Sequence, residues 1–516
     1  MLFNSFAFIF AFLPITLFLF FLAAKYNKDL ALIILLLASI IFYGWNNYHF
    51  IILLLFSIVV NFVIGKYIIA SILISRKKFI LCIGLIFNLS LLAYFKYTNF
   101  FIETVNLIHN GYFSHADIIL PIGISFFTFT QIAYLVDCYH GLVKKYHFFH
   151  YALFVTYYPH LIAGPIIHHK EVMPQFDKRK TFVFNYRNFT LGMVIFVIGL
   201  FKKIILADHL AAFVSPIFDI DESTISALDA WIASLSYTLQ LYFDFSGYSD
   251  MAIGLSLLIG IKLPINFYSP YKSKNIIEFW RRWNITLSRF LRDYLYISLG
   301  GNRRGVVRRY INLMLTMLLG GLWHGANWTF VAWGCLHGIY LCFNHWCIAL
   351  KKRLGLKESK NFLFKWISCF FTFLLVTVAW VFFRAPNFSV AYKILHAMFF
   401  QPLTLPGYWP IPAVIKMILI KLNIGFTIPS AWVGSDVVAN FYSVSLIFIS
   451  FIIIWGMPNT YQIMHKYRIA LFPLKEKIHT WLNWKPNLAW NLLITIAFIF
   501  DILFIQASSI FLYFNF

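Results

Sequence analysis

Long uninterrupted apolar runs constrain this chain more than any other feature of its sequence. Of its 516 residues, 61% are hydrophobic and only 12% are charged, whereas a soluble globular domain carries about 25% charged residues. Many runs approach or exceed the ~20 apolar residues that a helix needs to cross a bilayer. They do not alternate apolar and polar residues as barrel strands do. The sequence therefore predicts an all-α polytopic membrane protein, with residues 1–516 forming a single membrane-embedded domain.

The basic residues indicate the topology and exclude one class of partner. The formal net charge is +23, and the Lys and Arg side chains cluster in short loops between apolar runs, as cytoplasmic loops do. This distribution argues against nucleic acid as a partner. We expect about eleven to thirteen membrane elements, with an extracytoplasmic loop region over residues 384–436. The six cysteines form no C-x-x-C pair, so neither a zinc site nor a disulfide framework is indicated.

Two apolar segments have basic residues beyond both ends, so neither is expected to cross the membrane. The first, Tyr151–Ile167, contains three residues that interrupt helices: Pro159, Gly164 and Pro165. The second is a predicted helix over Asn275–Leu299. Irregular backbone at membrane depth is tolerated only where it is buried in protein or lines a wet cavity. We therefore expect re-entrant segments that line a site.

A histidine stands inside one of the apolar runs, in the stretch Leu319–Trp328. Titratable groups are rare at membrane depth because their desolvation is costly, so His324 is a candidate functional residue. Glycines on both sides of Trp323 and His324 leave room for a close backbone or a ligand. The alternative is a histidine that bonds a neighbouring helix or lies at the headgroup level.

The densest polar cluster of the apolar body lies within Glu278–Tyr294. Glu278 and Arg282 are four residues apart, as are Arg289 and Asp293, so each pair can meet on one helix face. A helix that lies along the inner membrane surface, with its arginines on lipid headgroups, would explain the charges.

That surface helix explains less well why Trp280, Trp283 and Asn284 share the same turns. Because the segment is not expected to cross the membrane, its polar residues could instead be buried in the protein. We therefore favour a buried, substrate-facing role for this helix.

Two further carboxylates, Asp244 and Asp250, fall in the middle of an apolar run. Isolated carboxylates would be too costly to keep there, so we expect each to pair with a cation. The candidate partners are Arg281, Arg282 and Arg289. The predicted role of the carboxylates is structural: they would hold the polar helix in place.

Several kinds of chemistry find no support in the sequence. His337 follows His324, but no Asp or Glu stands at a spacing that would complete a metal site, so we expect no metal. The chain has no G-x-S-x-G elbow, no Walker motif and no dinucleotide fingerprint. Any group that is transferred must therefore arrive on an already activated substrate.

The segment 508–516 is aromatic to its last residue, although chain ends are usually polar and frayed. We expect it to insert in the protein or in the membrane interface, where an aromatic anchor is the ordinary explanation.

Several ordered motifs together resemble the membrane-bound O-acyltransferase (MBOAT) superfamily. The resemblance is to its bacterial branch of alginate O-acetylases, peptidoglycan O-acetyltransferases and teichoic-acid D-alanyl transferases, and among these to the alginate O-acetylases most closely. It covers about Pro121–Tyr340, with a catalytic core over 120–345, and the tail. The matching stretches are Leu120–Phe129, Ala163–Ile166, Asp244–Asp250, Phe279–Tyr296, Leu299–Arg303 and Leu322–Gly325.

The resemblance implies a funnel-shaped multi-pass protein of the bacterial inner membrane, in which a cytoplasmic acyl donor meets an outward-facing acceptor. It implies that His324 is the catalytic histidine. The alginate and teichoic-acid members usually carry a second histidine where this chain has Asn284, which excludes a two-histidine mechanism. Asn284 would instead hold the thioester or its oxyanion. Tyr513 of the tail would relay the acyl group.

The resemblance also implies a thioester donor, acetyl-CoA or another acyl thioester, with no permanently bound cofactor. Its phosphates would meet the inner arginines. The donor-binding residues that we expect are Arg281, Arg282, Arg289, Trp280 and Trp283, with Asp244, Asp250, Glu278 and Asp293 as structural polar residues.

Two hypotheses follow from the sequence. The first is an O-acyltransferase that moves an acetyl group across the membrane, so that an extracytoplasmic partner protein can O-acetylate a polysaccharide such as alginate. Peptidoglycan, cellulose, lipid-linked sugars and D-alanylation of teichoic acid remain alternatives, and a carrier protein could replace coenzyme A. The second hypothesis is a proton-coupled transporter, against which the absence of an internal repeat counts weakly.

Overall fold

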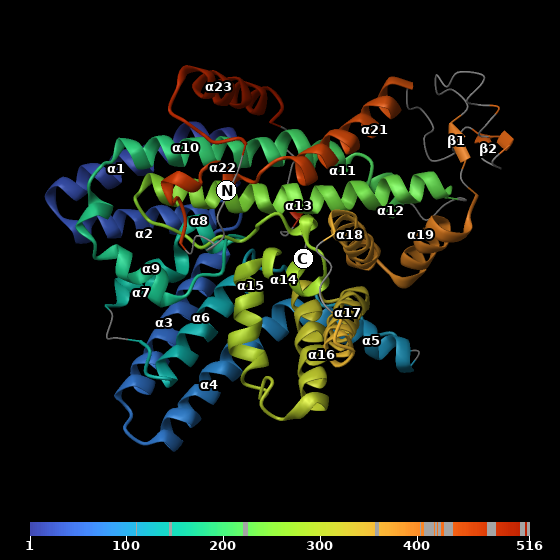
Figure 1. The fold of residues 1–516 in the computed structure, drawn as a ribbon. Coiled ribbons are helices and arrows are strands. Elements are labelled where there is room, and N and C mark those ends of the chain that lie inside the picture. Colours follow the sequence, from blue (N-terminus) through green and yellow to red (C-terminus); the bar gives the residue numbers. More distant parts are fainter. Residues whose placement is uncertain are drawn as a thin grey trace.

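A computed structural model describes most of the chain: residues 1–109, 111–143, 147–219, 225–356, 361–402, 404–406, 417, 420–421, 425–427, 437–471, 481–505 and 511–512. Helices dominate the described residues (Figure 1). The short strands β1 (Thr404–Pro406) and β2 (Gly425–Thr427) pair in parallel. The predicted all-α membrane protein is thus confirmed, with one small strand pair added.

Five stretches of the described chain are long and apolar enough to cross a membrane: Ala7–Tyr26, His49–Ala70, Ile74–His109, Tyr186–Ala211 and Phe362–Arg384. The elements within them are η1 (Ala7–Phe12), α1 (Leu13–Tyr26), α3 (His49–Ala70), α4 (Ile74–Leu92), η2 (Ala93–Tyr97), α5 (Thr98–His109), α10 (Tyr186–Phe201), η4 (Lys202–Ala207), α11 (Asp208–Ala211) and α18 (Phe362–Arg384).

The other long helices are shorter than these spans, more polar or more deeply packed: α2 (Lys28–Gly44), α6 (Ile124–Tyr139), α13 (Ala227–Leu258), α16 (Gly305–His324) and α17 (Trp328–Arg353). Shorter ones are η3 (Arg179–Phe182), α12 (Ser215–Phe218), η5 (Pro270–Lys272), α19 (Phe388–Phe400), α21 (Val437–Phe451), η8 (Ile452–Gly456), α22 (Thr460–Ile463), η9 (His465–Tyr467) and α23 (Leu488–Leu503).

The helix α13 is the buried axis of the molecule, and α10 lies along it (Figure 1). Glycines make this contact close. A Cβ added to Gly254 would lie 2.6 Å from the Gly192 oxygen, and one added to Gly199 would lie 2.6 Å from the Gly247 oxygen. Small residues let backbones approach in this way where a membrane removes the hydrophobic force between helices.

The segment Tyr151–Ile167 is broken, as predicted. It forms α7 (Phe148–Thr156) and α8 (Tyr158–Leu161), and the chain is then non-helical until α9 (His169–Phe176). Every residue from 151 to 169 is buried. The irregular backbone thus lies inside the protein, where a membrane allows it.

The predicted helix over Asn275–Leu299 is also broken, although its sequence contains no internal proline or glycine before Leu299. It forms α14 (Ile276–Arg282), α15 (Ile285–Phe290) and the π-helical turn η6 (Leu291–Tyr296). The prediction of one continuous helix is wrong, and that of a segment that does not cross the membrane stays a prediction. The break falls at Asn284, whose φ of 38° is left-handed.

The helices α16 and α17 form a tight antiparallel pair that ends at His324 (Figure 1). Gly321 meets the Phe330 main chain, and Gly325 meets the Phe330 ring, more closely than any Cβ would allow. The side chain of Asn327 caps α17 by accepting a hydrogen bond of 3.0 Å from the Thr329 N–H. The glycines around His324 therefore serve a close helix contact, as their sequence positions indicated.

Candidate active site

His324 is the last residue of α16 and is only 3% exposed. Its ring is enclosed by aromatic rings, with centroids 4.9 Å away for Trp323, 5.1 Å for Trp333 and 5.2 Å for Phe383. The end of a helix is a place where main-chain groups lack helical partners, so polar groups gather there.

Two side chains from η2 satisfy the carbonyls at that helix end. The Lys96 ammonium donates to the main-chain oxygens of Trp323 (2.6 Å) and His324 (3.1 Å). The Tyr97 hydroxyl donates to the oxygen of Leu322 (2.8 Å). A cation at a helix C-terminus also complements the helix dipole. Lys96 thus places its amine against the end of α16 that carries the candidate catalytic histidine, a contact that sequence reasoning missed.

A small pocket lies against His324, with a volume of about 30 Å³. It brings together the end of α16, Lys96, residues 120–126 and Ile162 of the broken segment. Gly123 turns the chain here with a φ of 72°, and a Cβ at this position would lie 3.0 Å from the Leu161 oxygen. The motifs Leu120–Phe129 and Leu322–Gly325 therefore line one site.

His337 lies behind this pocket and is fully buried. Trp280 Nε1 donates a hydrogen bond of 3.2 Å to His337 Nδ1. The Trp333 ring stands between the two histidines, 5.1 Å from the ring of His324 and 4.8 Å from that of His337. Among the described residues, no group of three or more His, Cys, Asp or Glu side chains could hold a metal ion.

Asn284 occupies the break between α14 and α15 and is 2% exposed. Asn266 holds the turn after it: its main-chain oxygen accepts from the Ile285 N–H (2.9 Å), and its Oδ1 accepts from the Thr286 N–H (3.2 Å) and hydroxyl (2.9 Å). The Thr286 hydroxyl in turn accepts from the Ile166 N–H (2.9 Å). Within the described chain, the Asn284 side-chain amide makes no hydrogen bond.

A row of packed rings connects the Asn284 turn to His324. The centroid distances are 5.0 Å from Trp283 to Trp380, 5.5 Å from Trp380 to Trp333 and 5.1 Å from Trp333 to His324. Trp280 and Trp283 are both buried. The structure thus places these two tryptophans in an aromatic core between the polar elements, and their binding of a donor stays a prediction.

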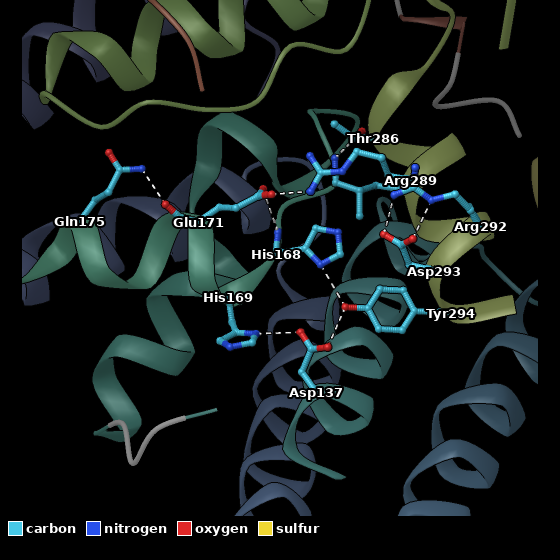
Figure 2. A network of polar contacts seen from close by, with 11 residues as sticks. Asp137, His168, His169, Glu171, Gln175, Thr286, Arg289, Arg292, Asp293 and Tyr294 are labelled. Atoms are coloured by element: carbon cyan, nitrogen blue, oxygen red, sulfur yellow. Dashed lines mark hydrogen bonds and ion pairs between the residues drawn. The ribbon is translucent and has the colours of Figure 1, made fainter. Parts of the chain in front are cut away.

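The arginines of this region pair only partly as predicted, and the pairs of Arg289 and Arg292 are drawn in Figure 2. Arg282 pairs with Glu278 at 2.8 Å, which confirms one spacing of four. The other predicted pair is wrong, because Arg289 pairs with Glu171 of α9 and Asp293 pairs with Arg292 at 2.7 Å. The helix changes to π geometry at Leu291, so residues four apart no longer face each other.

A network next to the Arg289–Glu171 pair was missed in the sequence (Figure 2). Asp137 lies 2.9 Å from His169 Nδ1 and accepts from the Tyr294 hydroxyl at 3.0 Å. His168 Nδ1 lies 2.9 Å from the same hydroxyl. The network ties α6 and α9 to η6, and the doublet His168–His169 directly after the broken segment was the signal that could have revealed it.

Asp244 and Asp250 each pair with a cation, as expected, but the expected partners are wrong, and so is the expectation that these pairs hold the polar helix in place. Lys203 pairs with Asp244 and Lys202 with Asp250, each at 2.6 Å. The lysines follow α10, which the glycine contacts bring alongside α13. Asp250 also accepts from the hydroxyls of Thr460 and Tyr461. The partners that were expected for these two carboxylates, and that the structure does not show among the residues it describes, are Arg281, Arg282 and Arg289.

The tail is described only in part. Phe511 is 1% exposed and inserts in the protein, and the Leu512 N–H donates to Asp244 at 3.2 Å. Insertion rather than interfacial anchoring is therefore the observed placement of these two residues. Tyr513 lies outside the described residues, so its predicted relay role has no structural test.

Comparisons with known proteins agree with the motif resemblance. The model of the membrane-bound O-acyltransferase family, MBOAT, matches residues 41–385. The peptidoglycan O-acetyltransferase of Helicobacter pylori is 41% identical over all of this chain and 98% of its own length. The probable alginate O-acetylase of Pseudomonas aeruginosa is 43% identical over 82% of this chain and 79% of its own length.

A more distant relative is the teichoic acid D-alanyltransferase of Streptococcus thermophilus, 29% identical over 46% of this chain and 60% of its own length. These matches favour the acyltransferase hypothesis over the transporter. The chain belongs to the membrane-bound O-acyltransferase family and is a multi-pass membrane O-acyltransferase.

Proposed function

We propose that this protein transfers an acetyl group from cytoplasmic acetyl-CoA through its membrane domain, for O-acetylation of an extracytoplasmic polysaccharide. The observation that carries the proposal is the placement of His324: buried, at the end of α16, and facing a pocket lined by Lys96 and residues 120–126. An imidazole in such a place can accept and return a proton without competition from bulk water.

In the proposed reaction, His324 takes the proton from an attacking hydroxyl as its oxygen bonds to the thioester carbonyl carbon. The carbon–sulfur bond then breaks, and His324 returns the proton to the departing thiolate. The Asn284 amide, which has no partner among the described side chains, would donate to the oxyanion. Each of these two groups is expected to contribute about two to four orders of magnitude in rate.

The donor would bind from the cytoplasmic side, on the arginines of α14. Arg281 is exposed and makes no ion pair with any described residue, which leaves its guanidinium available for a phosphate. Arg282 and Arg289 are already engaged in ion pairs, with Glu278 and Glu171 respectively. Arg281 is therefore the foremost of the predicted donor-binding residues.

Peptidoglycan is the acceptor polymer that we favour. The Helicobacter pylori relative, named a peptidoglycan O-acetyltransferase, aligns with this chain from end to end, including the last quarter. The alginate O-acetylase match covers a smaller share, and the D-alanyltransferase match less than half. Alginate is the second candidate. In both versions the protein would lie in the bacterial inner membrane, and Tyr513 would pass the acetyl group to an extracytoplasmic partner protein.

The test uses membranes that contain the full chain and acetyl-CoA labelled in the acetyl group. Wild-type membranes should transfer label to protein and polysaccharide, and His324→Ala should reduce the transfer at least a hundredfold. His209→Ala is the matched control, because this histidine bonds the Ile204 oxygen away from the pocket and should retain full transfer. Undiminished labelling by His324→Ala would contradict the proposal. Mass spectrometry of muropeptides and exopolysaccharide, with and without the protein, identifies the polymer.

A further inference from the structure

The C-terminal segment returns to the centre of the protein and bonds a carboxylate there. Asp244, in the middle of α13, is 2% exposed. One of its oxygens accepts the Leu512 N–H at 3.2 Å, and the other lies 2.6 Å from the Lys203 ammonium. A main-chain donor from position 512 therefore meets a buried ion pair that is 268 residues away in sequence.

The residue before Leu512 closes the same site from the other side. The Phe511 ring packs edge-on against Tyr248, with centroids 4.4 Å apart and planes at 90°. The Lys203 ammonium lies 4.8 Å from the centroid of the Phe511 ring, within the range of a cation–π contact. Two adjacent tail residues thus contact the same lysine–aspartate pair through different chemistry.

The charges of this cluster explain why it accepts the tail. Lys203 also pairs with Asp208 at 2.8 Å, so one ammonium faces two carboxylates. A buried carboxylate is costly unless further hydrogen bonds supplement its ion pair, and the Lys203 ammonium, which is shared with Asp208, contacts only one of the two Asp244 oxygens. The Leu512 N–H supplies the missing donor, and hydrogen bonds to charged groups are about twice as strong as neutral ones.

We propose that Asp244 and Lys203 are positioning residues for the C-terminal segment: they seat Phe511 and Leu512 in the centre of the protein, and acetyl transfer depends on this seating. This inference rests on the proposed function for its catalytic meaning. It assigns the buried carboxylate of the Asp244–Asp250 motif a role in seating the chain's own tail, in addition to bracing α13.

Asp250 provides a matched control for Asp244. It lies on the same helix, is equally buried and is paired with the neighbouring lysine at the same distance of 2.6 Å. Its hydrogen bonds go to Thr460 and Tyr461, and its described contacts do not include the tail. A loss of one carboxylate charge can thus be compared at two sites, only one of which holds the tail.

The first experiment measures tail seating without reference to activity. Purified full-length protein in detergent is treated with a carboxypeptidase and followed by intact-mass spectrometry. Wild type and Asp250→Asn should keep their C-termini, whereas Asp244→Asn should be trimmed at least tenfold faster, toward position 511. Equal resistance of Asp244→Asn and wild type would overturn the proposal, as would equal trimming of both Asn variants.

A second variant tests the same hydrogen bond in case Asp244→Asn fails to fold. Leu512→Pro removes the donor N–H while it leaves every residue of α13 and η4 unchanged. It should be trimmed as fast as Asp244→Asn. If it stays fully protected, the main-chain hydrogen bond does not hold the tail.

The catalytic part is tested by acetyl transfer. Asp244→Asn should lower kcat at least tenfold with little change in KM for acetyl-CoA, and in a chain that already carries Leu512→Pro the same substitution should lower it no further. A further decrease in the Leu512→Pro background would show that Asp244 does not act through the tail. If His324→Ala retains activity, the proposed function fails, while the trimming assay still decides whether the tail is seated on Asp244.

Discussion

The Lys96 ammonium lies 3.1 Å from the main-chain oxygen of His324, and so a lysine from η2 holds the last turn of α16 beside the pocket. It also bonds the Trp323 oxygen at 2.6 Å and the Ser125 hydroxyl at 3.3 Å. These contacts connect three segments that the sequence separates by up to 228 residues. The geometry makes Lys96 a positioning residue for His324.

Lys96→Met should therefore lower acetyl transfer more than it lowers stability. Hydrogen bonds to a charged donor contribute about 1.5–3 kcal/mol, and a loss of that size in the placement of His324 would slow transfer about ten- to a hundredfold. The stability change should be smaller, because Met removes a costly buried charge. Transfer rate and thermal unfolding are measured together. Lys66→Met, at an exposed lysine of α3, should match wild type, and an equally active Lys96→Met would refute the positioning role.

Asn284→Gly separates the backbone of Asn284 from its side chain. The φ of 38° is a left-handed conformation that glycine adopts without the steric cost of about 1 kcal/mol that other residues incur. The glycine variant should be at least as stable as wild type, whereas Asn284→Ala should be less stable. If the amide binds the oxyanion, both variants lose about a hundredfold or more in kcat. Full activity of the glycine variant would mean that only the turn matters.

The Arg289–Glu171 pair can be tested by a double substitution. Glu171→Gln leaves Arg289 without its partner carboxylate and should destabilise the protein by about 1–3 kcal/mol, since Arg289 is partly exposed. Adding Arg289→Met should restore much of the thermal stability. Donor affinity then distinguishes two roles: if Arg289 also binds coenzyme A phosphates, KM for acetyl-CoA stays raised in the double variant. A KM equal to that of wild type would make this arginine structural only.

The α10–α13 contact predicts a strong effect from a single methyl group. Gly254→Ala would place a Cβ 2.6 Å from the Gly192 oxygen, inside van der Waals distance of rigid backbone. The helices would have to move apart, at a cost of about 1–3 kcal/mol. Gly456→Ala is the control, because its Cβ would meet its nearest neighbour at 4.0 Å. Denaturant or thermal unfolding in detergent measures both, and equal stability of the two variants would contradict the close packing.

Local sequence signals were sufficient for the long helices, for the break in Tyr151–Ile167 and for the close helix contact around His324. A long apolar run directly predicts a membrane helix. Pro159, in a segment with basic residues beyond both of its ends, predicts a helix that stops inside the protein. The glycines near His324 indicated a close neighbour, which is the main chain of Phe330. Each of these inferences depends on a few adjacent residues.

The features that the sequence did not predict depend on contacts between residues that are distant in sequence. Asn266 and Ile166 bond the turn that follows Asn284 and so hold the break in the helix, and both residues are distant from it in sequence. Asp244 and Asp250 pair with lysines rather than arginines because glycines bring α10, and the lysines that follow it, against α13. An ion pair within one helix is readable from spacing, whereas one between helices requires knowledge of which helices touch.

The small size of the pocket beside His324 bears on how well the membrane retains its ion gradients. A membrane enzyme whose substrates arrive from opposite faces risks becoming a leak for ions that the cell has pumped out. About 30 Å³ of the space beside His324 can be occupied by water, which is room for a molecule or two. If the proposed transfer runs through this pocket, so narrow a space would let a two-carbon group pass while it hinders a hydrated ion, and the electrochemical gradient would be preserved.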